Sequence, residues 1–230
     1  TVEKTEKTGE VFSGVNVSGS EDSDGRALAG ARLEYKNRFA NEKCAIVIKD
    51  KSEEVRRKNA MEDEKSKITA AAIEKMIDFY QGNLRDIEHF LKVWAYAKTI
   101  GEQESVDENT QGILELAAVV HDISCPLCRE KYGNTNGKNQ ELESEPLVKE
   151  FFEGMPVSEQ KVERIIWLVT HHHTYTNIDG IDYQILIEAD FLVNASESNF
   201  SKVSIENAKS RIFKTAAGCR LLESIFLREE

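Results

Sequence analysis

The sequence predicts an all-α protein, a helical bundle preceded by a less structured N-terminal segment. From residue 66 onward, apolar residues recur at intervals of three and four, which is the period of a helix with one buried face. The alternation of apolar and polar residues that is typical of strands is almost absent from this stretch. Since 40% of the residues are hydrophobic, the chain can bury one substantial core. We therefore expect one main domain, residues 61–230, and an N-terminal extension, residues 1–60.

The N-terminal extension is predicted to be poorly ordered. Residues 18–25 read Ser-Gly-Ser-Glu-Asp-Ser-Asp-Gly, a polar composition that is typical of turns or disorder. Residues 44–49 alone resemble a short strand. Because the helical pattern starts just after Met61, one hypothesis is that Met61 is the native first residue.

Seven or eight helices are predicted from residue 66 to the end of the chain. The first two cover about 66–81 and 84–100, and each ends at a glycine, which favours helix termination. The third starts at the capping sequence Ser-Val-Asp-Glu, residues 105–108, and runs to about residue 122. A long loop rich in glycine and asparagine is expected at 124–138. Further helices are expected at about 140–152, 158–172, 181–196, 201–214 and 216–228.

The acidic composition argues against a protein that binds duplex DNA or long RNA. The formal net charge is -11 and the pI is about 5.1, so a broad basic surface is not expected. A small anion is still compatible with this charge, because a few cations or one bound metal can hold a single phosphate.

Cysteine usage and the lack of long apolar runs favour a cytoplasmic protein that does not enter a membrane. The four cysteines, Cys44, Cys125, Cys128 and Cys219, are too few and too scattered for a disulfide framework in a chain of this length. The first residues lack the basic and apolar regions of a signal peptide. No apolar run approaches the roughly 18 residues that a membrane span needs.

The five histidines fall at positions that could serve one metal site: His89, His121 and the run His171 to His173. Histidine is the commonest transition-metal ligand in proteins. His89 lies on an apolar stripe of its predicted helix, and His121 with Asp122 ends a helix that is apolar almost all round. The alternatives are a hydrogen-bonded core histidine at position 89 and an ion pair or helix-end contact at position 121.

Asp190 also needs a partner. It lies between Ala189 and Phe191 in a helix that is predicted to be buried, and an unpaired buried carboxylate is costly. A bound cation would compensate it. The alternative is an aspartate that accepts hydrogen bonds from the backbone or from an arginine.

The histidine run ends the predicted helix 158–172. Continuing the helical step of about 100° per residue places His172 and His173 on the buried side and His171 on the outside. The alternative role for these histidines is to cap the C-terminus of the helix.

Taken in order, His89, the dipeptide His121-Asp122, and Asp190 resemble the signature of the HD-domain phosphohydrolase superfamily. The resemblance covers about residues 66–228, and the stretch His-His-His-Thr-Tyr resembles small, stand-alone bacterial members. The resemblance implies a metal held by these four side chains, and hydrolysis of a phosphate ester, usually that of a nucleotide. Two histidines and two aspartates suit Mn, Fe, Co, Ni or Zn better than Ca, and Mg is possible.

The number of metals is a separate question. Members of the superfamily with two metals usually carry a further histidine in the helix after the loop, and this chain has Glu141, Glu143 and Glu145 there instead, which favours a single ion. His172 and His173 are then expected to contact the phosphate, or a second metal if one glutamate substitutes. The expected catalytic residues are Asp122, His172 and Lys138, of which the last two would stabilise the transition state.

Two features near the His-Asp dipeptide have open roles. The stretch Arg129 to Lys138 carries three cationic side chains among glycines and could close over a phosphate; the alternative is an ordinary surface loop. Cys125 and Cys128 form a lone CxxC motif, which is weak evidence for zinc and weaker evidence for redox chemistry.

The predicted function is a metal-dependent phosphohydrolase whose partner is a small phosphorylated substrate, expected to be a nucleotide. One alternative is a phosphodiesterase for cyclic or signalling nucleotides, which a second metal would favour. The other is a ligand-binding module of the same fold without catalysis. The sequence leaves the substrate, the resident metal and the oligomeric state open.

Overall fold

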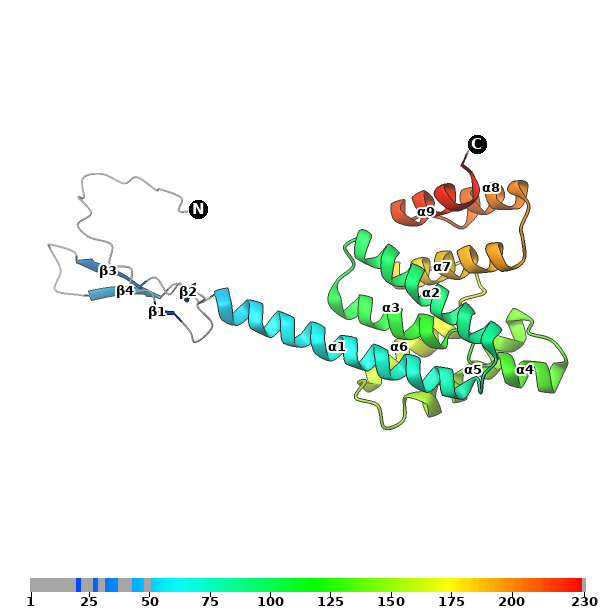
Figure 1. Cartoon of the computed structure of the whole chain (residues 1–230), viewed down its shortest axis with the longest axis horizontal. Coiled ribbons are helices and arrows are strands. Elements are labelled where there is room, and N and C mark those ends of the chain that lie inside the picture. Colours follow the sequence, from blue (N-terminus) through cyan, green and yellow to red (C-terminus); the bar gives the residue numbers. More distant parts are fainter. Residues whose placement is uncertain (1–19, 22–26, 29–31, 37–42, 48–50, 229–230) are drawn as a thin grey trace. The chain divides into compact units, whose positions relative to one another are not determined.

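The computed structural model describes residues 20–21, 27–28, 32–36, 43–47 and 51–228. The chain divides into two compact units, Thr1–Met61 and Glu62–Glu230, and each is described by itself. Helix α1 (Lys51–Phe79) crosses the boundary between them (Figure 1). It begins well before the predicted residue 66, because the segment that follows Lys51 is rich in glutamate, lysine and arginine, which favour helices without an apolar stripe.

The first unit contains two antiparallel strand pairs among its described residues. Strand β1 (Ser20–Glu21) pairs with β2 (Ala27–Leu28), and β3 (Arg32–Lys36) pairs with β4 (Lys43–Val47). The strand expected at 44–49 overlaps β4, but β3 was not predicted, although Arg-Leu-Glu-Tyr-Lys alternates charged and apolar residues. Residues 51–60 of the predicted poorly ordered extension belong to α1, and the remainder of the extension, apart from these strands, lies outside the described residues.

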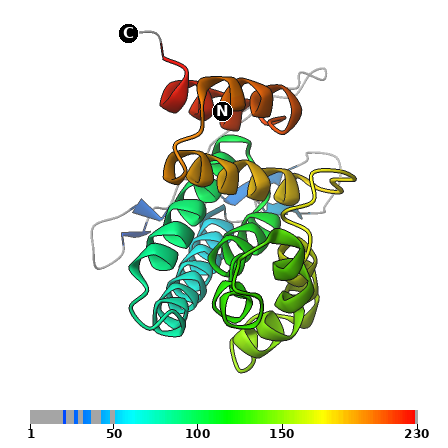
Figure 2. The same cartoon turned by 90° about the vertical axis from the view of Figure 1, so that its right-hand side faces the viewer.

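The second unit is helical from residue 62 to residue 226 apart from its connections, of which the longest spans residues 170–180, and this confirms the all-α prediction (Figures 1 and 2). After α1 come α2 (Leu84–Gln103), α3 (Glu108–Val120), α4 (Cys125–Tyr132), α5 (Gly137–Phe152), α6 (Glu159–Val169), α7 (Ile181–Glu197), α8 (Lys202–Arg211) and α9 (Ala216–Phe226). Among the described residues, no helix is both long and apolar enough to cross a membrane.

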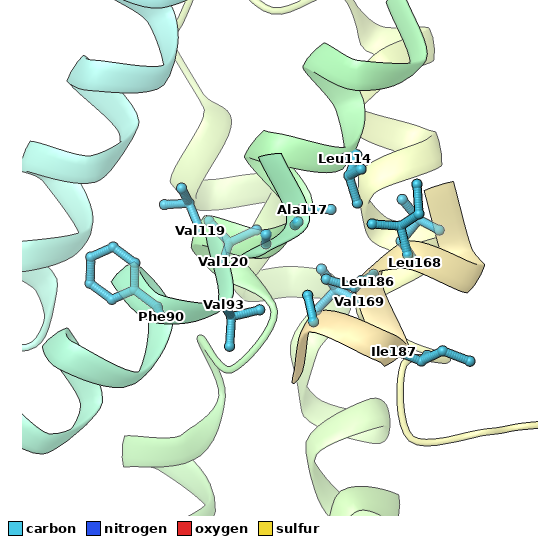
Figure 3. Packing of buried hydrophobic residues seen from close by; sticks show 14 of the residues in the cluster. Phe90, Val93, Leu114, Ala117, Val119, Val120, Leu168, Val169, Leu186 and Ile187 are labelled. Atoms are coloured by element: carbon cyan, nitrogen blue, oxygen red, sulfur yellow. The ribbon is translucent and has the colours of Figure 1, made fainter. Parts of the chain in front are cut away.

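Helix α3 lies at the centre of the core. All of its residues from Gln111 to Val120 are buried, because the helix packs against α2, α6 and α7. Figure 3 shows the side chains that meet there, and they come from all four helices. Helix α7 is buried almost as completely. The apolar sequences of α3 and α7 thus produce two interior helices, and α2 and α6 cover them with one apolar face each.

The loop predicted at 124–138 is wrong over its first half, where α4 forms. Pro126 lies in the first turn of α4, where its missing N–H costs no hydrogen bond. Gly133 ends the helix in the left-handed conformation, with φ of 70°. The connection that remains is short, and the Asn136 side chain caps α5 by accepting a hydrogen bond from the backbone N–H of Lys138. The proline was thus a sign of a helix start and not of a loop.

Glu188 of α7 ties the start of α9 to the core. Its side chain is fully buried, and one carboxylate oxygen accepts hydrogen bonds from the backbone N–H groups of Lys214 (2.6 Å) and Thr215 (3.0 Å). The other oxygen accepts from the Thr215 hydroxyl. Gly218 lies against the same carboxylate, and a Cβ at this position would collide with it. The buried carboxylate is therefore satisfied by donors at the start of α9 and by the Gln184 side chain of α7, whose Nε2 donates to it at 2.6 Å.

We predict that Glu188→Ala lowers the free energy of unfolding by about 3 kcal/mol, because it leaves several buried donors without an acceptor. Urea denaturation followed by circular dichroism measures this change. Glu223→Ala, which removes an exposed ion pair with Lys209, is the control and is expected to change the stability by less than about 1 kcal/mol. Equal stabilities for the two variants would contradict this account of Glu188.

Candidate metal centre

Three helices bring the predicted ligands together. His89 lies within α2, His121 directly follows α3 with Asp122 after it, and Asp190 lies within α7. His89, His121 and Asp190 are all buried, with exposed fractions of 7%, 0% and 2%. Helices α2, α3 and α7 contact one another in every pairing. The site is therefore built where the three helices meet, in the interior of the second unit.

The ligand atoms surround one point. His89 Nε2 lies 3.2 Å from His121 Nε2, 3.3 Å from Asp190 Oδ1 and 3.6 Å from Asp122 Oδ2. His121 Nε2 lies 3.6 Å from Asp190 Oδ1 and 3.8 Å from Asp122 Oδ2. Ligands about 2.1 Å from a common ion are about 3.0 to 3.4 Å apart at octahedral or tetrahedral angles. The spacing thus fits one metal ion with only small adjustments.

The hydrogen bonds of the two histidines aim Nε2 at this point. His121 Nδ1 is 2.8 Å from the backbone oxygen of Ala118, and His89 Nδ1 is 3.0 Å from Oε2 of Glu197. An oxygen partner favours the tautomer with the proton on Nδ1 and the lone pair on Nε2. Two ring nitrogens with lone pairs lie beside two carboxylates at these distances, and a bound cation would offset the repulsion among them. The side chains present therefore fit a metal chemically as well as geometrically.

The same crowding shifts the acid–base equilibria of the cluster. Burial lowers the pKa of His89, but the hydrogen bond to Asp190 and the charges of Asp122 and Asp190 outweigh burial and raise it to about 9. Burial raises the pKa of Asp190, yet His121 and His89 hold it well below its usual range. In the absence of a metal, a proton on His89 therefore supplies the compensating positive charge at neutral pH.

A second group of possible ligands adjoins the first through Asp122, whose Oδ2 also lies near His89 and His121. Asp122, His172 and His173 offer ligand atoms that lie within 4.8 Å of one another. His172 Nε2 is 3.6 Å from Asp122 Oδ1, the oxygen that faces away from His89. The Nε2 atoms of His172 and His173 are buried and have no hydrogen-bond partner. Two orphaned ring nitrogens beside a carboxylate could hold a second ion or a phosphoryl group.

His173 needs room, and the start of α5 provides it. A Cβ at Gly137 would lie 2.6 Å from the His173 ring, so a residue larger than glycine would displace this ring. Burial and the neighbouring His172 lower the pKa of His173 to about 4. The ring is therefore neutral near pH 7 and keeps a lone pair for a ligand. His171 lies elsewhere: its ring stacks on Trp167 at 3.8 Å between centroids.

The three glutamates of α5 do not join either group. Glu141 accepts a hydrogen bond from the Thr174 hydroxyl (3.1 Å). Glu143 is paired with Lys131 (2.6 Å), and Glu145 is paired with Lys149 (2.6 Å). Each carboxylate thus has another partner, and the side chain that completes the second group is His173.

The cations expected to close over a phosphate are mostly engaged. Arg129 forms an ion pair with Asp86, and Lys131 forms one with Glu143. Lys138 is exposed, and no hydrogen bond or ion pair joins its amino group to the described residues. A role for Lys138 in catalysis stays a prediction, since it would require the side chain to reach toward the cluster.

Cys125 and Cys128 are buried free thiols in the first turn of α4. Burial, with the nearby Asp122 charge, raises the pKa of Cys125, and burial also raises the pKa of Cys128. Neither cysteine belongs to a group of possible metal ligands among the described residues. They fill space beside the HD dipeptide in this structure.

Three residues around the site were not foreseen. Glu197 contacts His89, Asn194 donates a hydrogen bond to Asp190 Oδ1 (2.8 Å), and the Tyr80 hydroxyl donates to the backbone oxygen of Asp122 (3.0 Å). The first two were detectable, because residues four and seven positions after Asp190 share its helix face. Tyr80 gave no such signal, since its contact depends on the position of α1.

Comparisons with known proteins find one family model and similar solved structures. A family model described as HD domain matches residues 86–209, more than half of the 230 residues. One similar solved structure is described as a crystal structure of a predicted HD superfamily hydrolase from an uncultured Thermotogales bacterium. It is 20% identical, with a TM-score of 0.48, and the match covers 69% of this chain and 83% of that chain. No curated protein matches the chain.

We predict that metal binding releases about one proton at pH 7 to 8, because the ion must displace the proton held by His89. Apparent affinity for Mn²⁺ should therefore fall as the pH drops from 9 toward 6. Calorimetric titrations in buffers of different ionisation enthalpy measure the protons released. Binding heats that do not depend on the buffer would contradict the prediction.

Proposed function

Because this chain belongs to the HD domain family, we propose that it is a metal-dependent phosphohydrolase that cleaves a phosphate ester of a small metabolite, with a nucleotide as the expected substrate. The observation that carries the proposal is the convergence of His89, His121, Asp122 and Asp190 on one point. A divalent transition metal, such as Mn, Fe, Co, Ni or Zn, suits these ligands, and Mg is possible. Such an ion supplies an activated water and charge neutralisation when it is bound.

The side chains of this chain have distinct roles in the proposal. His89, His121 and Asp190 are buried and hold the ion, and helix packing fixes their positions. Asp122 is partly exposed, with its side chain at 20%, so it lies where substrate and water can enter. Its two oxygens face different histidines, His89 and His172. Asp122 can therefore bind the ion with one oxygen and stabilise positive charge on His172 with the other. Burial raises the pKa of Asp122, but His121, His172 and His89 outweigh burial and hold it well below its usual range.

His172 is the proposed residue for transition-state stabilisation. It is fully buried, its Nδ1 is 2.7 Å from the backbone oxygen of Val169, and its Nε2 has no hydrogen-bond partner. Burial lowers the pKa of His172, but Asp122 outweighs burial and raises it. A protonated imidazole at this position would donate a hydrogen bond to a phosphoryl oxygen. Lys138 is proposed as a second donor, from the first turn of α5.

One alternative is supported by a specific observation. The group formed by Asp122, His172 and His173 adjoins the group of His89, His121 and Asp190, because Asp122 Oδ2 lies 3.6 Å from His89 Nε2. A second ion held by this group would add neutralising charge beside the first, which suits hydrolysis of a phosphodiester. A second ion would thus favour a phosphodiesterase for cyclic or signalling nucleotides. A ligand-binding module without catalysis is the remaining alternative, and the open side of Asp122 argues against it.

We predict that Asp122→Ala abolishes turnover. A screen of nucleotide monophosphates, triphosphates and cyclic nucleotides, with Mn²⁺, Co²⁺, Ni²⁺, Zn²⁺ or Mg²⁺, identifies the substrate. Loss of a residue that only hydrogen-bonds to a metal ligand lowers metal affinity or activity by about 10- to 100-fold. Loss of the ligand itself should lower the activity at least as much. Glu223→Gln, which alters an exposed ion pair, should retain activity. Turnover that survives in Asp122→Ala would refute the mechanism, and no activity on any substrate would favour the binding module.

A second prediction concerns the number of ions. The phosphohydrolase proposal expects one tightly bound Mn²⁺ per chain, held by the first group, and His173→Leu should leave that stoichiometry unchanged. Equilibrium dialysis followed by elemental analysis counts the ions. Two ions in the wild type and one in His173→Leu would instead favour the phosphodiesterase.

A further inference from the structure

Three of the four histidines in the candidate metal groups have a hydrogen-bond partner at Nδ1, and these partners are not equivalent. His121 and His172 are held by backbone oxygens, those of Ala118 and Val169. His89 is held by a carboxylate, that of Glu197, at 3.0 Å. A backbone oxygen orients a ring, whereas a carboxylate also places a full negative charge on its far side. His89 is thus the one among these three whose strength as a ligand can be tuned by a charged side chain.

Glu197 is placed for this contact by the helix that supplies Asp190. Both residues belong to α7, and Glu197 follows Asp190 by two helical turns on the same face. Asn194, between them, donates to Asp190 Oδ1. Helix α7 therefore provides three parts of the site. Asp190 is a ligand, Asn194 is the donor that orients Asp190, and Glu197 is the acceptor that orients His89.

The second oxygen of Glu197 has a separate partner. Lys92 of α2 lies 3.2 Å from Oε1, and His89 lies 3.0 Å from Oε2. The Glu197 side chain is 20% exposed and that of Lys92 is 47% exposed. An ion pair with so exposed a lysine contributes little to stability. Holding α2 against α7 is therefore not a sufficient reason for a carboxylate at position 197. The contact with the nearly buried His89 ring is the part that affects the site.

We propose that Glu197 is a positioning residue of the metal centre, an inference that rests on the proposed function. Its carboxylate accepts the Nδ1 proton of His89, fixes the ring so that Nε2 faces His121 and Asp190, and through its charge makes His89 a stronger metal ligand. Such carboxylate partners of metal-binding histidines commonly contribute 10- to 100-fold to metal affinity.

The test compares Mn²⁺ affinity of the full-length, metal-free wild type with that of Glu197→Gln, by measuring free Mn²⁺ with electron paramagnetic resonance. Glutamine keeps the shape and one acceptor oxygen but removes the charge. We expect the affinity to fall about tenfold in Glu197→Gln and further in Glu197→Ala. The melting temperature of metal-free Glu197→Gln should stay close to that of the wild type, which separates ligand tuning from a structural role.

Glu115→Gln is the matched control. Glu115 is also a carboxylate paired with lysines, Lys65 at 3.1 Å and Lys98 at 3.4 Å, but it belongs to neither group of possible ligands. Its Mn²⁺ affinity should equal that of the wild type. An affinity of Glu197→Gln within twofold of the wild type would overturn the role of Glu197 while leaving the proposed function intact. A wild type that binds no Mn²⁺ would overturn both.

Discussion

The mutual approach of ionisable side chains at the junction of α2, α3 and α7 is the constraint on which the second unit depends. The Nε2 atoms of His89 and His121 lie 3.2 Å apart, and each lies between 3.3 and 3.8 Å from oxygens of Asp122 and Asp190, although three of the four residues are buried. Hydration cannot offset the repulsion between like groups there, so a proton or a metal has to. The surrounding apolar core of α3 and α7 keeps the groups from separating (Figure 3).

Helix α7 shows how one buried helix can serve opposite purposes on different faces. Its Glu188 accepts hydrogen bonds from the start of α9 and has no part in the candidate site. Its Asp190, two positions later, points into that site. Because consecutive positions on a helix turn by about 100°, two buried carboxylates so close in sequence can each have a full set of partners. The acidic residues of α7 therefore cannot be interpreted from burial alone.

The sequence was informative wherever chemistry is local. The helical period, the apolar α3 and the polar residues interrupting buried helices led to the all-α class and to the residues that converge. It failed where contacts decide the outcome. Pro126 lies in the first turn of a helix and not in a loop. Glu141 accepts a hydrogen bond from Thr174, and His173 is the side chain that lies with Asp122 and His172. The sequence places Glu197 on the same helix face as Asp190, but its contact with His89 depends on how α2 packs against α7.

The contact between Gly137 and His173 links two positions that are distant in sequence. A histidine at 173 can stay beside Asp122 only while position 137 lacks a side chain, and a larger residue at 137 is harmless only once the histidine is gone. Relatives of this chain should therefore change the two positions together. This covariation offers a way to sort homologues into those that retain the second group and those that have lost it, before any of them is purified.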